Sequence, residues 1–133
     1  MNNPNIAFVK ALYVAFQQGR VQTIVDAVAP NVDWQTVGRS KDYPAFGPRK
    51  GRAAVEEFFG IVAENEVFSE FAPREFFSDA DRVFAFGRYA GTLTKTGRRF
   101  ETEWVHVFTI RDGKVIRFRE HTDTAQFAEG YRA

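Results

Sequence analysis

The spacing of apolar residues changes once along the chain, near Ala63, and this change limits the possible folds more than any other feature. Before it, apolar residues recur mainly three or four positions apart, as on one face of a helix. After it, they alternate with polar residues, which is the period of a half-buried strand. Helices followed by a run of strands predict an α+β domain with helices on one face of a bent antiparallel sheet.

Three helices are expected in the first half of the chain. The first begins at Asn3, a typical N-cap residue, with Pro4 at the first helical position, and it ends at Gly19. The second covers about 21–28. The third follows Gly51. These helices supply the apolar faces that cover the sheet.

Two shorter segments lie among these helices. Residues 32–36 alternate and predict a short strand. Residues 38–50 hold two Pro, two Gly and five charged residues, so we expect a loop. Long loops in small domains often serve function. We therefore expect residues 43–46 to form a mobile lid over a pocket mouth.

The second half predicts a meander of four strands and a final helix. Turn residues divide the strands at 78–81, 95–97 and 111–113. Asp123 and Gln126 stand three residues apart, which is typical of a capping box at the start of a helix. The helix then runs to the end of the chain.

Composition excludes several classes of protein. The 133 residues suit one domain, 1–133, and the balance of 18 basic and 17 acidic residues argues against a nucleic-acid partner and a polybasic membrane anchor. The absence of Cys excludes disulfides and Cys nucleophiles. The chain has no long apolar run and no signal-peptide pattern, so we expect a cytoplasmic protein. Fifteen Phe against two Leu indicate a core built from rings, which can line an apolar cavity.

The register of the last hairpin decides which residues share a face. A two-residue turn at 112–113 places Glu120 opposite Val105 and mixes charged with apolar side chains. A three-residue turn at 111–113 places Glu120 opposite Trp104 and puts charged and apolar side chains on opposite faces. Because burial of one face fixes the register, we expect the three-residue turn.

In this register the inner face is aromatic except for His106 and Glu120. The two are then diagonal neighbours, roughly 7–8 Å apart between backbones. A Glu beside a His in an apolar setting is typical of a general acid/base pair. A buried hydrogen-bonded pair that only satisfies its own polar groups explains the pattern equally well.

Tyr89 is the third candidate for catalysis. It joins the face of Trp104 if residues 96–97 form a two-residue turn, whereas a three-residue turn brings Arg88 there instead. We favour Tyr89, because a buried Arg would need a partner. Its hydroxyl could orient a carbonyl or donate a proton, or it could belong to an ordinary core tyrosine.

Apolar and aromatic residues are expected to form the substrate-binding wall. This set comprises Trp104, Phe118, Trp34, Tyr13, Phe16, Phe46, Phe58, Phe59 and Val62. For Trp34 and Tyr13, a plain wall or core role is the simpler interpretation.

The other histidine, His121, falls on the outer, charged face of the sheet, beside Glu103 and Arg119. Two isolated His with different facings and no third ligand at suitable spacing do not make a metal site. We expect no metal and no cofactor.

The closing strands resemble a known family. The segment HVFTIRDGKVIRFREHTDT, with FETEW before it and GRYAGTL upstream, is similar to the SnoaL-like polyketide cyclases. These belong to the nuclear transport factor 2-like (NTF2-like) superfamily, together with ketosteroid isomerases and limonene epoxide hydrolases. The resemblance implies a cone, in which N-terminal helices close over the concave face of a curved antiparallel sheet with a mixed edge. It also implies a deep apolar pocket and a homodimer.

The resemblance carries over only some site residues. His106 stands where the cyclases have a pocket His, and Glu120 where cyclases and epoxide hydrolases have a working Asp. The Arg and second Asp of the epoxide hydrolases are replaced by Gly87 and Tyr89. The isomerase base falls near Thr36, and the isomerase acid has no counterpart. Neither steroid isomerisation nor the water activation of the epoxide hydrolases is therefore expected.

Two functions follow from this combination. The first is cofactor-independent isomerase- or cyclase-type chemistry on a small apolar, carbonyl-bearing molecule, with Glu120 as general acid/base. In this case His106 orients Glu120 or stabilises developing oxyanion charge, and Tyr89 and Trp104 position the substrate. The alternative is a non-catalytic homodimeric module of the same fold that binds a ligand or a protein.

Overall fold

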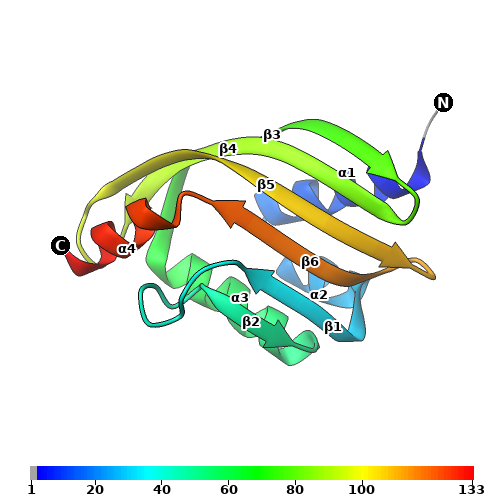
Figure 1. Cartoon of the computed structure of the whole chain (residues 1–133), viewed down its shortest axis with the longest axis horizontal. Coiled ribbons are helices and arrows are strands. Elements are labelled where there is room, and N and C mark those ends of the chain that lie inside the picture. Colours follow the sequence, from blue (N-terminus) through cyan, green and yellow to red (C-terminus); the bar gives the residue numbers. More distant parts are fainter. Residues whose placement is uncertain (1–2) are drawn as a thin grey trace.

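The computed structural model describes residues 3–133, which form four helices and six strands (Figure 1). In chain order these are α1 (Pro4–Gln17), α2 (Val21–Ala27), β1 (Val28–Thr36), β2 (Gly47–Lys50), α3 (Arg52–Asn65), β3 (Glu66–Asp79), β4 (Arg82–Leu93), β5 (Arg99–Arg111), β6 (Lys114–Thr122) and α4 (Thr124–Arg132). The predicted α+β class is confirmed.

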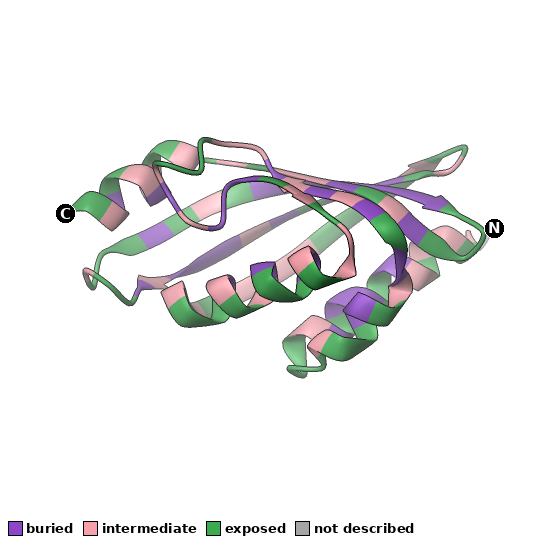
Figure 2. Ribbon diagram, turned by 90° about the horizontal axis from the view of Figure 1, so that it is seen from below, coloured by how far each residue is buried: buried purple, intermediate pink, exposed green. Residues whose placement is uncertain are grey.

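The strands form one mixed, open sheet in the order β2-β1-β6-β5-β4-β3. Neighbouring strands are antiparallel, except that β1 and β6 run parallel. Figure 2 shows the first three helices together on one side of the sheet, with α4 at the end that carries the C-terminus. No helix within residues 3–133 is long and apolar enough to cross a membrane.

The start of α1 follows the prediction, whereas the start of α4 does not. The Asn3 side chain accepts hydrogen bonds from the backbone N–H groups of Asn5 and Ile6, which have no partner inside the helix. At α4, Asp123 accepts only from the Gln126 side chain and caps no backbone N–H. Gln126 instead bonds the backbone of Glu101 in β5, so the predicted capping box is wrong.

The predicted loop at 38–50 is too long. Its last four residues form β2, which pairs antiparallel with β1 from Thr36↔Gly47 to Asp33↔Lys50. The Gly and Pro in this stretch suggested a loop, but β2 is an edge strand, where a proline costs no hydrogen bond in the sheet.

The predicted turn between β5 and β6 is also wrong, although the predicted faces are right. Asp112 and Gly113 both have positive φ, 52° and 74°, as in a two-residue hairpin turn. A bulge at Ile116 then adds one residue to β6 and restores the alternation. His106 therefore lies directly opposite Glu120 rather than diagonal to it.

The sheet also brings backbone and side chains unusually close at Gly87. A Cβ at this position would overlap the indole of Trp104, its partner across β4 and β5, and the carbonyl of Ala72. The missing side chain lets the Trp104 ring lie over the β4 backbone. This packing fixes the position of the Trp104 ring.

Candidate functional site

The helices and the sheet enclose an apolar pocket with a cavity volume of about 90 Å³. Most of the predicted wall residues line it: Tyr13, Phe16, Trp34, Phe46, Phe58, Phe59, Val62 and Phe118. The pocket draws on both helical and sheet residues.

Trp104 is the exception among the predicted wall residues. It is 1% exposed and lies behind the lining rather than in it. Its ring stacks on His106, with centroids 3.9 Å apart and planes 18° apart. Because Gly87 leaves room beneath it, Trp104 supports the histidine instead of touching the pocket space.

A line of hydrogen bonds crosses the floor of the pocket, from α1 through β5 to β6. The Tyr13 hydroxyl lies 2.7 Å from Nδ1 of His106, and Nε2 of His106 lies 2.7 Å from Oε2 of Glu120. The side chains of His106 and Glu120 are 7% and 13% exposed. All three residues line the pocket.

The direction of these hydrogen bonds follows from the tyrosine. Burial, with the charge on Glu120, raises the pKa of Tyr13 well above its usual value, so the hydroxyl keeps its hydrogen. That hydrogen is satisfied when Tyr13 donates to Nδ1 of His106. With Nδ1 accepting, Nε2 of His106 carries the ring hydrogen and donates to Glu120. His106 thereby orients the carboxylate.

Two further hydroxyls surround Glu120. Thr36 in β1 donates to its Oε1 at 3.0 Å. The Tyr89 hydroxyl lies 3.4 Å from its Oε2 and 2.7 Å from Oγ1 of Thr122. Burial raises the pKa of Tyr89, so this hydroxyl also stays protonated. A carboxylate held by several donors is positioned to accept or return a proton.

Tyr89, rather than Arg88, faces the pocket. Tyr89 is 4% exposed and pairs across the sheet with Thr102. Arg88 points to the outer face, where it forms ion pairs with Glu70 at 2.9 Å and Glu101 at 2.6 Å. The face of Tyr89 was predicted correctly, but the predicted two-residue turn at 96–97 is wrong, because residues 94–98 join β4 to β5.

A second polar pair in the pocket was not predicted. The Tyr43 hydroxyl donates to Oε2 of Glu66 at 2.7 Å, and both residues line the pocket. Glu66 stands at the junction of α3 and β3, where neither the helical nor the strand period assigns a face.

Thr36 was also not predicted as a site residue. Its contact with the pocket could have been predicted, because it alternates with Trp34 on β1.

The environment of Glu66 changes its acidity. Burial is the main cause that raises its pKa from 4.5 to about 8; the hydrogen bond from Tyr43 lowers it and the charge on Glu120 raises it further. Glu66 is therefore mostly protonated at neutral pH. The pocket thus holds two carboxyl groups in different settings.

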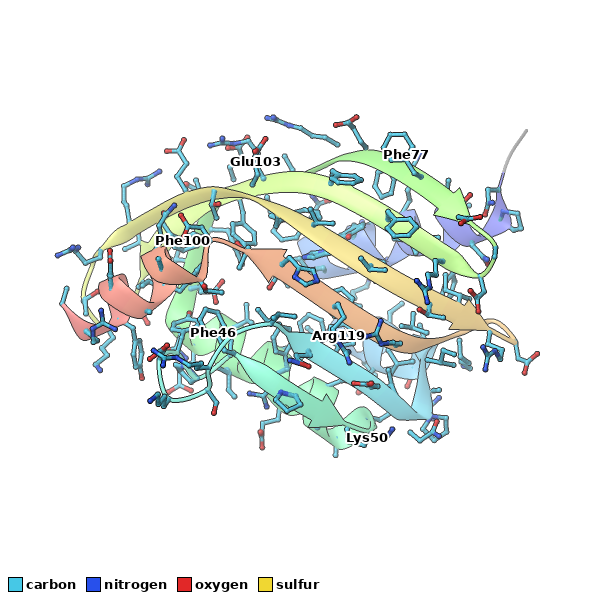
Figure 3. All side chains as sticks on the ribbon, viewed as in Figure 1. Phe46, Lys50, Phe77, Phe100, Glu103 and Arg119 are labelled. Carbon is cyan, nitrogen blue, oxygen red and sulfur yellow. The ribbon has the colours of Figure 1, made fainter. Side chains whose placement is uncertain are left out.

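Aromatic side chains close the end of the pocket near α4. Figure 3 shows Phe46 and Phe100 at this end of the molecule. Phe127 of α4 packs against both, with ring centroids 6.1 Å and 4.9 Å away, and against Tyr43 at 5.3 Å. Tyr43 and Phe46 are 1% and 3% exposed. The mobility of this predicted lid stays a prediction.

His121 is exposed and pairs across the sheet with Val105, on the outer face, as predicted. In the part of the chain that the structure describes, no three His, Cys, Asp or Glu side chains gather in a way that could hold a metal ion.

Comparison with known proteins places this geometry in context. A family model described as a SnoaL-like domain matches residues 9–118. An NTF2-like protein from Burkholderia pseudomallei is 27% identical with a TM-score of 0.88, covering 99% of this chain and 100% of that chain. One from Burkholderia xenovorans is 29% identical with a TM-score of 0.85, covering 96% and 95%.

A third solved structure contains a small molecule. TerC, co-crystallised with polyporic acid, is 30% identical to this chain, with a TM-score of 0.83, and the match covers 98% of this chain and 100% of TerC. A search of the curated proteins gave no match.

Proposed function

The chain belongs to the SnoaL-like family of NTF2-like proteins, and from this premise we propose that it catalyses cofactor-independent acid/base chemistry on a small apolar, carbonyl-bearing molecule. The observation that carries the proposal is the hydrogen-bonded line Tyr13–His106–Glu120 on the floor of an otherwise aromatic pocket. The co-crystallisation of TerC with polyporic acid supports a small molecule as the ligand class.

In this proposal Glu120 is the base. Its carboxylate takes a proton from the carbon next to the substrate carbonyl. The electron pair of the broken C–H bond forms a C=C bond, and the carbonyl π electrons move to oxygen. The Tyr89 hydroxyl donates a hydrogen bond to that oxygen, while His106 holds Glu120 in place. Return of the proton to the same or another carbon completes exchange or isomerisation.

Related activities of the superfamily fit less well. Gly87 and Tyr89 replace the Arg and Asp expected of an epoxide hydrolase, and the space beside Gly87 is filled by Trp104. Thr36 takes the place of the isomerase base and serves Glu120 instead. The proposal is therefore proton transfer next to a carbonyl rather than water addition.

The assembly belongs to the same proposal. We propose that the chain acts as a single-domain homodimer in the cytoplasm, and that its partner is a small molecule rather than a nucleic acid or a membrane. The balanced charge supports the last point.

Hydrogen–deuterium exchange tests the chemistry without knowledge of the natural substrate. 2-Tetralone is a small apolar ketone with exchangeable protons next to its carbonyl, and NMR in deuterated buffer follows their loss. We expect the protein to accelerate this exchange and Glu120→Gln to lower the rate at least about 100-fold, because general base catalysis typically contributes 10²–10⁴-fold.

Glu103→Gln is the matched control, because Glu103 is an exposed carboxylate on the outer face of β5. This variant should accelerate the exchange of 2-tetralone as much as the unmodified protein does. Equal rates for Glu120→Gln and the unmodified protein would remove Glu120 from catalysis. Both variants are compared at the same folded fraction, measured by circular dichroism.

A non-catalytic binding module is the second candidate function. The observation that favours it is that the Glu120 carboxylate already has protein hydrogen-bond donors on both oxygens, as a purely structural pair would. In that case 2-tetralone binds but exchanges no faster than in buffer.

A further inference from the structure

The pocket contains a second polar site that the proposed proton transfer does not use. Glu66 begins β3, and Tyr43 lies in the segment between β1 and β2. The 2.7 Å hydrogen bond between Tyr43 and Oε2 of Glu66 joins two segments far apart in the sequence. Both side chains line the same pocket as Glu120.

One oxygen of Glu66 is left free. Within residues 3–133, Oε1 of Glu66 makes no hydrogen bond and the carboxyl group forms no ion pair with a basic side chain. This oxygen is also not sealed off by protein atoms, unlike the buried, unpartnered Nε1 of Trp34. Because Glu66 lines the apolar pocket, we place this oxygen within reach of a ligand bound there.

The hydrogen of the carboxyl group belongs on this free oxygen. Burial keeps Glu66 mostly protonated at neutral pH. The Tyr43 hydroxyl stays protonated too, because burial raises its pKa, and it donates to Oε2. An acid hydrogen on Oε1 therefore has no protein acceptor and can be donated into the pocket. The titratable groups that shift the pKa of Glu66 are Tyr43 and Glu120, and the charge on Glu66 in turn raises the pKa of Tyr89.

The two carboxyl groups belong to one ligand space. They come from β3 and β6, which are separated in the sheet by β4 and β5. The helix-covered face nevertheless brings them near enough for the charge on Glu120 to act on Glu66. A negatively charged ligand group at Glu66 would be repelled by that same charge. The complementary group is a neutral hydrogen-bond acceptor.

We propose that Glu66, held by Tyr43, is a ligand-binding subsite that donates a hydrogen bond from Oε1 to a neutral carbonyl or ether oxygen. The pocket then selects apolar molecules with oxygen functions at two positions, one near Glu120 and one at Glu66. This selection rests on the proposed function only for the role of Glu120. Binding at Glu66 stands without it.

A matched pair of probes tests the subsite. Acetophenone and ethylbenzene have nearly the same shape, and they differ by the carbonyl oxygen that Glu66 would bind; neither probe titrates. NMR titration of the full chain, to the solubility limit of each probe, gives the ratio of their Kd values. At pH 6.5 we expect acetophenone to bind about fivefold more tightly, which is the effect of one net hydrogen bond.

Two substitutions at Glu66 make the result specific. Glu66→Gln keeps a donor that does not titrate, so it should keep the preference at pH 6.5 and at pH 9.5. Glu66→Leu should lower the preference at both values to what the Tyr89 hydroxyl alone can supply. The unmodified protein should have the full preference at pH 6.5 and fall to the level of Glu66→Leu at pH 9.5, where the ionised carboxylate can no longer donate.

The outcomes separate this subsite from the catalytic proposal. An undiminished preference in Glu66→Leu overturns the subsite, as does the absence of acetophenone binding up to 10 mM. Glu120→Gln should retain the preference for acetophenone even when exchange of 2-tetralone is lost. If Glu120→Gln retains both, the catalytic proposal fails while the subsite stands.

Discussion

His106 owes its position to rings as much as to hydrogen bonds. Trp104 stacks on one face, and the Tyr13 ring lies nearly parallel to the imidazole, with centroids 5.8 Å apart and planes 15° apart. Phe118 meets it edge-on at 5.0 Å. A histidine confined in this way cannot rotate freely, so its two nitrogens remain directed at Tyr13 and Glu120. The aromatic excess of the chain thus positions a polar group.

At the residue scale, Glu66 predicts how stability depends on pH. Its pKa in the folded protein, about 8, lies above the ordinary 4.5. The folded state keeps a proton that the unfolded state loses, so this contribution to stability is full below pH 4.5 and is lost as pH rises toward 8. Relative to Glu66→Gln, the free energy of unfolding should fall by up to about 1.4 kcal/mol per pH unit in this window.

Urea denaturation at several pH values measures this difference. Glu64→Gln, an exposed carboxylate two residues away on α3, is the control and should follow the unmodified protein. Parallel curves for the unmodified protein and Glu66→Gln between pH 5 and 8 would contradict the raised pKa.

The two carboxyl groups also show what sequence reasoning can find. Glu120 was identified because it interrupts a clear alternation of apolar residues in β6. Glu66 interrupts nothing, since it stands where one period ends and the next begins. Tyr43 was assigned to a lid, because no periodicity covers residues 38–46 and its facing could not be predicted. Their meeting depends on how α3, α4 and the sheet pack, which no local pattern contains.

At the element scale, β5 and β6 show the difference between a face and a partner. Alternation predicted correctly that Trp104, His106, Phe118 and Glu120 share one face. It could not predict which residues lie opposite, because a two-residue turn with a bulge gives the same faces as a three-residue turn. The bulge at Ile116 makes His106 and Glu120 direct neighbours. His106 and Glu120 therefore lie closer together than predicted.

Close packing of β4 against β5 predicts a large effect at Gly87. In Gly87→Ala, the new Cβ would overlap the Trp104 indole and the Ala72 carbonyl, so the indole must shift and its stack on His106 must loosen. Overpacking of this kind typically costs about 1–3 kcal/mol. We expect a loss of this size in urea denaturation, with a change in the near-ultraviolet circular dichroism of tryptophan.

Gly60→Ala is the matched control on α3. A Cβ there meets nothing within 4 Å, and alanine favours helix, so stability should rise by about 0.5–1 kcal/mol. A Gly87→Ala variant as stable as the unmodified protein would mean that Trp104 does not need this space.

At the scale of the whole molecule, the outer face of the sheet carries an apolar stripe across β3, β4 and β5. Phe77 and Phe86 are 55% and 37% exposed, with ring centroids 5.8 Å apart. Val105 pairs across the sheet with Phe86, and Figure 3 shows Phe77 at the outer edge strand. Arg88 and His121 lie beside the stripe. Exposed apolar patches with a polar rim are typical of interaction surfaces.

We therefore predict that the proposed homodimer forms through this face. Light scattering at about 10 µM should give twice the mass of one chain, and Val105→Lys should give the mass of one chain, because a buried, unpaired ammonium group at a dimer interface is strongly unfavourable. Val14→Lys is the matched control: Val14 is a 45% exposed valine on α1, on the helical side of the molecule, and its substitution should leave the dimer intact. A monomer for the unmodified protein contradicts the dimer itself. A dimer that survives Val105→Lys but not Val14→Lys would place the interface on the helices. The pocket would then have to open on another face.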